Sequence, residues 1–251
     1  MSDTITLTID DIDIKGKPGQ TIMQAADDNG IYIPRLCAHK DLTPYGSCRV
    51  CTVIVNGRPQ SACTQPIAEG MIIENDSDRV KDIRRDIIDM LFVEGNHYCM
   101  FCERSGSCEL QAIAYRLGIT APRFPYMFNK KEVDASHHDI MIDHNRCILC
   151  ARCIRASRDI DDKNIFQFTG RGPHRKLAVN SEANLKDTDA QVTDRAFSIC
   201  PVGSLLRKRR GFNIPIGQRL YDHKPIGSDI EENSKDSLFS SNNPKEQRET
   251  H

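Results

Sequence analysis

Cysteine spacing constrains this chain more than any other feature. Eleven of the 251 residues are cysteines, and they fall into three groups separated by longer stretches. The chain starts with alternating polar and apolar residues instead of the basic start and apolar run of a secretory signal, so we expect a cytoplasmic location. The cytosol keeps thiols reduced, and an odd number of cysteines cannot all pair in disulfides. The pattern therefore predicts bound metal.

The first group has the spacing of a 2Fe-2S site. It contains Cys37, Cys48, Cys51 and Cys63, with one C-x2-C pair in a glycine-containing loop and a distant fourth cysteine. A close pair with a remote ligand is typical of plant-type 2Fe-2S ferredoxins, although the first gap is ten residues here and four there. Zinc is the alternative, but zinc sites often use two C-x2-C pairs. We predict a 2Fe-2S cluster.

The last group has the spacing of a 4Fe-4S site. Cys147, Cys150 and Cys153 form C-x2-C-x2-C, and Cys200 stands directly before Pro201. In bacterial ferredoxins with two clusters, the remote Cys-Pro ligand serves the other cluster. Only one such triplet occurs here, so we expect Cys200 to close the same cluster.

The middle group is one thiolate short of a set. It contains Cys99, Cys102 and Cys108, and His97 lies two residues before the first of them. An imidazole replaces a thiolate in Rieske centres. A lone histidine is more often an ordinary surface residue, but the missing fourth ligand favours His97 here. We predict a second 4Fe-4S cluster on these four residues.

The residues between the cysteines indicate an α+β chain. Apolar and polar residues alternate over 5–9 and again over 12–14, which predicts a hairpin in a strand-rich domain that spans 1–78. Thr21 and Gln24 have the spacing of a capping box, which predicts that a short helix follows Thr21.

A helical period replaces the alternation after residue 78. We expect a helical unit with a linker over 79–139, a third unit over 140–211 and an extended or disordered tail over 212–251, which is polar and aperiodic beyond Gly227. One apolar face of the first helix is predicted to contain Val80, Ile83, Ile87 and Leu91.

Composition excludes several function classes. The formal charge of -1 and the pI of about 6.7 give no basic excess for binding nucleic acid. No apolar run approaches the roughly 18 residues of a membrane span, so we expect no direct membrane insertion. The sequence has no G-x-G-x-x-G after a strand and no phosphate loop, which predicts that no flavin or nicotinamide site lies in this chain.

The order of the three groups resembles the N-terminal iron-sulfur part of the large iron-sulfur subunit of complex I. Local strings over 33–37, 46–51 and 200–203 are similar to it. The shorter length, with Glu94-Gly95-Asn96-His97 and Arg123-Phe124-Pro125-Tyr126, resembles the small diaphorase, or gamma, subunit of soluble NAD-reducing nickel-iron hydrogenases. One departure from complex I is H-x-C spacing at the histidine, where complex I has H-x3-C.

This resemblance implies a β-grasp 2Fe-2S ferredoxin-like domain, a small helical domain with a histidine and three cysteines, and a 4Fe-4S ferredoxin-like domain. It implies an electron-transfer subunit of an oxidoreductase complex, without a substrate-converting site of its own. Expected partners are a large diaphorase subunit that binds FMN and NAD, and the small and large subunits of a nickel-iron hydrogenase.

Two other functions remain open on the sequence. The chain is also compatible with the iron-sulfur subunit of an NAD-dependent formate dehydrogenase or of another complex I-like NADH dehydrogenase, because the same clusters serve each. From a different class, a zinc-stabilised scaffold or redox sensor would use the same cysteines without electron transfer.

Overall fold

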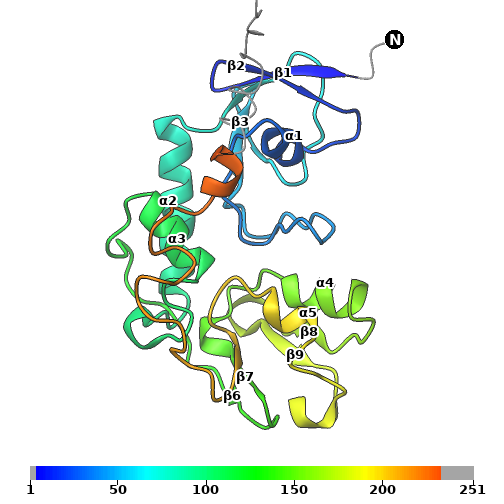
Figure 1. Ribbon diagram of the computed structural model, residues 1–251, viewed down its shortest axis with the longest axis vertical. Coiled ribbons are helices and arrows are strands. Elements are labelled where there is room, and N and C mark those ends of the chain that lie inside the picture. The colour runs from blue at the N-terminus through cyan, green and yellow to red at the C-terminus, as the bar shows by residue number, and fades with distance from the viewer. Residues whose placement is uncertain (1–3, 233–251) are drawn as a thin grey trace, which may run out of the picture.

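A mixed five-stranded sheet forms the first unit of the computed structural model, which describes residues 4–232 (Figure 1). The elements are β1 (Ile5–Ile9), β2 (Ile12–Gly16), α1 (Ile22–Asp28), β3 (Thr52–Val55), β4 (Arg58–Ser61) and β5 (Ile72–Glu74). The strand order is β2-β1-β5-β3-β4, in which β1 and β5 are parallel and the other neighbours antiparallel. Helix α1 shares its core with this sheet. This is the predicted β-grasp arrangement.

Local sequence signals explain the ends of these elements. The predicted capping box is present: the Thr21 side chain accepts from the Gln24 backbone N–H at 3.3 Å, and Gln24 Oε1 accepts from the Thr21 N–H at 2.9 Å. Asn56 and Gly57 have φ of 48° and 80°, the left-handed pair that joins β3 to β4 in a tight hairpin.

Helix α2 runs along one side of the molecule and connects the sheet to the rest of the chain (Figure 1). The second unit contains α2 (Asp78–Val93), the 3-10 helix η1 (Cys99–Phe101) and α3 (Glu109–Arg116). The buried face of α2 differs from the predicted one. Arg84 and Ile88 are buried, whereas Ile83, which was predicted to lie on the buried face, is half-buried. Arg84 is buried because it donates to the Thr52 carbonyl at 3.1 Å and to Asn75 at 2.8 Å, which fixes α2 on the first unit.

The third unit combines two small sheets with short helices. Its elements are β6 (Val133–Asp134), β7 (Ile140–Asp143), η2 (His144–Arg146), α4 (Arg152–Asp159), β8 (Phe166–Thr169), η3 (Gly172–His174), β9 (Lys176–Val179), η4 (Leu185–Asp187), α5 (Arg195–Ser198) and β10 (Leu205–Arg207). The sheets have the orders β10-β7-β6 and β8-β9. Strand β6 lies in the stretch predicted as a linker, where it pairs with β7.

One hydrophobic core joins the second and third units. Buried residues of α3 pack with β7, α4 and α5, and the same core takes in Leu36, Leu42 and Val50 from the cysteine-bearing loop of the first unit. The ligand-bearing loops of all three units are therefore held against one another by packing. No helix within residues 4–232 is long and apolar enough to span a membrane.

The last described segment, 212–232, packs back on the chain. It runs from the third unit past α3 to the first unit (Figure 1). Ile226 is buried, and Arg116 donates to its carbonyl at 2.9 Å and forms an ion pair with Glu231. Residues 228–232, predicted to be a disordered tail, instead form a helical turn held by these contacts. The rest of the predicted tail, 233–251, lies outside the described residues.

Candidate metal centres

The first cysteine group comes together beside the β-grasp sheet. Three of its members are buried, and Cys48 is half-buried in the loop before β3. The Cys37 backbone N–H donates to Cys48 Sγ at 3.3 Å. Hydrogen bonds from the thiols of Cys48 and Cys63 lower the pKa of Cys37, and contact with Cys37 and Cys51 raises the pKa of Cys63. The four predicted ligands thus lie together in a chain of contacts in which Cys37 touches Cys48 and Cys63, and Cys63 touches Cys51.

The middle group lines one small cavity, with His97, Cys99, Cys102 and Cys108 all on its wall. Two glycines permit this approach. A Cβ on Gly203, before β10, would lie 2.6 Å from Cys102 Sγ, and a Cβ on Gly95 would lie 2.5 Å from His97 Nε2. Both contacts are shorter than real Cβ atoms show, so these positions require glycine while the side chains keep these places.

The His97 ring is prepared to act as a neutral ligand. Its Nε2 is buried and has no hydrogen-bond partner within the described part of the chain. The ring also makes a hydrogen bond with the Leu91 backbone. Burial and the charge of Arg146 lower the pKa of His97 to about 4. The imidazole is therefore uncharged at neutral pH, as metal coordination requires.

The last group surrounds a cavity between α4 and β10. Cys147, Cys150, Cys153 and Cys200 all line it. The C-x2-C-x2-C loop bends around this cavity through two left-handed residues, Leu149 with φ of 52° and Ala151 with φ of 59°. Such a conformation is costly for residues with a Cβ, and it is found where a site demands it.

Burial keeps several of these thiols protonated unless they bind a metal. It raises the pKa of Cys147 to about 11 and the pKa of both Cys108 and Cys150 to about 12. A bound metal cation ionises a coordinating thiol outright. Each set offers four donors, all thiols in two sets and three thiols with one imidazole in the middle set, and both kinds of donor bind iron in iron-sulfur clusters. Among residues 4–232, no three Cys, His, Asp or Glu side chains are placed to hold a single metal ion.

Sequence reasoning missed the arginines that lie between the groups. Arg146 donates to Cys102 Sγ at 3.5 Å, Arg104 to the Cys200 carbonyl at 3.3 Å, and Arg155 to the Cys37 carbonyl at 2.5 Å. The only sequence signal is their position one or two residues from the nearest cysteine. Hydrogen bonds from cations to sulfur and to ligand carbonyls raise the reduction potential of a nearby cluster by stabilising its negative charge.

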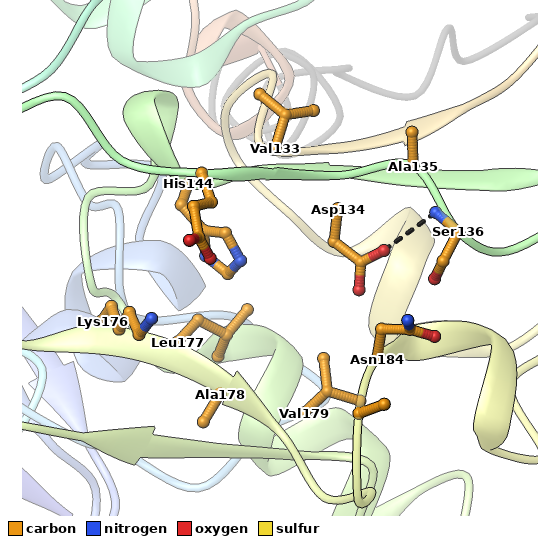
Figure 2. A pocket seen from close by; sticks show the side chains of 12 residues that line it. Val133, Asp134, Ala135, Ser136, His144, Lys176, Leu177, Ala178, Val179 and Asn184 are labelled. Atoms are coloured by element: carbon orange, nitrogen blue, oxygen red, sulfur yellow. Dashed lines mark hydrogen bonds between the residues drawn. The ribbon is translucent and has the colours of Figure 1, made fainter.

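A separate pocket lies between β6 and β9. Figure 2 shows His144 and Lys176 on one side of it, and Asp134, which accepts from Ser136, on the other. None of its lining residues is a cysteine. This pocket is larger than either of the two cysteine-lined cavities and is separate from the predicted metal ligands.

Three family models match successive parts of the chain. They describe a 2Fe-2S iron-sulfur cluster binding domain over residues 2–78, an NADH-ubiquinone oxidoreductase-G iron-sulfur binding region over 84–123, and an NADH-quinone oxidoreductase subunit 3 ferredoxin-like domain over 138–206. The fold, the three donor sets and these matches define an α+β iron-sulfur protein with ferredoxin-like domains.

Individual relatives narrow the class to a family. The NAD-reducing hydrogenase HoxS subunit gamma of Cupriavidus necator is 40% identical over 224 residues, which are 89% of this chain and 95% of the relative. The 78 kDa subunit of mitochondrial NADH-ubiquinone oxidoreductase from Candida albicans is 32% identical over 212 residues, 83% of this chain but 29% of the relative. The crystal structure of an NAD+-reducing [NiFe]-hydrogenase in the H2-reduced state contains a chain that superposes with a TM-score of 0.86 at 45% identity, covering 89% of this chain and 95% of that one. This chain belongs to the family of gamma subunits of NAD-reducing hydrogenases.

Proposed function

We propose that this chain is the iron-sulfur electron-transfer subunit of a cytoplasmic NAD-reducing hydrogenase. It would hold a 2Fe-2S cluster on Cys37, Cys48, Cys51 and Cys63, a 4Fe-4S cluster on His97, Cys99, Cys102 and Cys108, and a second 4Fe-4S cluster on Cys147, Cys150, Cys153 and Cys200. When bound, such clusters accept and release single electrons.

The observation that carries this proposal is the collection of all twelve predicted ligands into three buried or half-buried sets. Two of these sets line their own cavities, and the third is in direct thiol contact. Packing in one shared core holds the ligand loops close together. The polypeptide would therefore position the clusters, keep water away from their sulfurs and set their potentials through nearby charges.

The proposed partners follow from the family. The chain would receive electrons from, or deliver them to, a large diaphorase subunit that carries FMN and NAD, and would exchange them with the small and large subunits of a nickel-iron hydrogenase. The similarity to a hydrogenase gamma subunit over 89% of the chain favours this assignment over formate dehydrogenase.

Metal analysis of the chain and of its complex tests the proposal. The chain separated from its partners under anaerobic conditions is expected to contain about ten irons and as many acid-labile sulfides, as one 2Fe-2S and two 4Fe-4S clusters require. Nickel and FMN should be present in the intact complex. Molybdenum in place of nickel would instead identify a formate dehydrogenase, and zinc without sulfide would identify a metal scaffold.

The isolated chain tests where the flavin resides. It should bind neither FMN nor NAD, because it contains no phosphate-binding loop. A stoichiometric flavin that stays with the isolated chain through gel filtration would contradict this part of the proposal.

A further inference from the structure

Arg152 lies where the loops of the three donor sets meet. It stands between Cys150 and Cys153 at the start of α4, and only 2% of its surface is exposed. Its guanidinium forms a bidentate pair with Glu109, at 2.6 and 2.7 Å, and donates to the Ala38 carbonyl at 2.8 Å. Arg152 is thus a buried cation of the third unit that forms hydrogen bonds with both the first and the second unit.

Glu109 and Ala38, the partners of Arg152 in the other two units, are both neighbours of predicted ligands. Ala38 follows Cys37 of the first set, and Glu109 follows Cys108 of the middle set. Since Arg152 itself belongs to the loop of the last set, a single side chain connects all three. Bidentate pairing of a planar guanidinium with a carboxylate also fixes orientation, which a lysine cannot reproduce.

The charge of this pair acts on the last set. Besides its place two residues after Cys150, Arg152 donates to the carbonyl of Ile199, directly before Cys200, at 3.5 Å, so its positive charge would lie beside the thiolates of a cluster bound here. Such interactions are stronger in a poorly hydrated interior than at the surface. Glu109 offsets part of this charge, because its carboxylate is in direct contact with the guanidinium.

We propose that Arg152 is a positioning residue for electron transfer and that its buried charge, balanced by Glu109, sets the midpoint potential of the cluster on Cys147, Cys150, Cys153 and Cys200. The inference rests on the proposed function, since it needs that cluster. Reduction adds one electron to the cluster and breaks no bond, so a nearby cation favours the reduced form and a nearby anion disfavours it.

Opposite changes of the pair should therefore shift the potential in opposite directions. In anaerobically purified complexes, the midpoint potential of this cluster is measured by redox titration followed by EPR. Arg152→Met leaves the carboxylate alone and should lower the potential, whereas Glu109→Gln leaves the cation alone and should raise it. Arg152→Lys retains the charge and should restore the potential most of the way to wild type.

The same helix supplies a matched control. Arg158 also lies on α4, but its side chain is 54% exposed and pairs with its neighbour Asp159. Arg158→Met should leave the potential unchanged, because solvent screens an exposed charge. Iron and sulfide content is measured for each variant, so that loss of the cluster is not mistaken for a shift.

The outcomes separate the inference from the function on which it rests. A wild-type complex without the EPR signals of 4Fe-4S clusters would refute the proposed function itself. Full clusters with unchanged potentials, or with shifts of the same sign in Arg152→Met and Glu109→Gln, would refute the role of the charge pair. If Arg152→Met does not assemble, Glu109→Gln decides alone: a raised potential supports the inference, and an unchanged one overturns it.

Discussion

Replacing Gly203 by alanine should remove the middle cluster and leave the other two. The added Cβ would lie 2.6 Å from Cys102 Sγ, about 1 Å inside the ordinary contact distance of roughly 3.5–4.0 Å. The cysteine or the strand behind it must move by that amount, and ligand sites tolerate displacements of only about 0.5 Å. Overpacking of this kind also costs about 1–3 kcal/mol of stability.

The assay for Gly203→Ala is iron and sulfide content of the anaerobically purified complex. We expect the iron content of the complex to fall by about four per copy of this chain relative to wild type, the loss of one cubane. Gly211→Ala is the control, because its Cβ would meet a single atom, Cγ of Glu103, at 3.1 Å, a contact that a shift of a few tenths of an ångström relieves. It should keep all of its iron. A Gly203→Ala complex with wild-type iron content would refute the placement of Cys102 as a ligand beside this glycine.

Two further outcomes follow from the ligand environments. His97→Ala should lower the iron content by about four per chain, because it removes the imidazole from the middle set. His138→Ala is the control and should lose no iron, because the His138 side chain is 81% exposed. Equal iron content in the two variants would exclude His97 as a ligand. Release of iron to a chelator, followed by visible absorbance, should be faster at pH 6 than at pH 8. Burial raises the pKa of Cys147 to about 11 and of Cys150 to about 12, so each departing iron leaves a thiolate that takes up a proton. A higher proton concentration therefore favours release of iron. A release rate that rises with pH would contradict this reasoning.

Local signals in the sequence were sufficient for much of the fold. The capping box at Thr21, the alternation that forms β1 and β2 and the helical period after residue 78 that forms α2 each depend on residues a few positions apart. The spacing of the cysteines likewise selects a small number of metal chemistries, because few sites use a C-x2-C-x2-C triplet with a remote partner.

Contacts between distant residues were not accessible in this way. Burial of Arg84 on α2 depends on carbonyls of the first unit that lie 9 and 32 positions earlier. Arg152 is polar and stands in a cysteine loop, and nothing near it in sequence indicates that Ala38, 114 positions away, will accept its hydrogen bond. The turn over 228–232 was missed for the same reason, since Ile226 and Arg116 stabilise it through tertiary packing.

Rapid hydrogen-driven reduction of NAD through the intact relay is the central claim, and Cys150→Ser tests it most directly. The substitution removes one of four thiolates from the last set, so the cluster there should lose its iron or its potential. In a complex shown by gel filtration to be fully assembled, oxidation of NADH by an artificial dye should persist, because that reaction needs only the flavin partner. Hydrogen-driven NAD reduction should collapse. If the assembled Cys150→Ser complex reduces NAD with hydrogen at the wild-type rate, electrons do not pass through this site and the account of the chain as a relay is wrong.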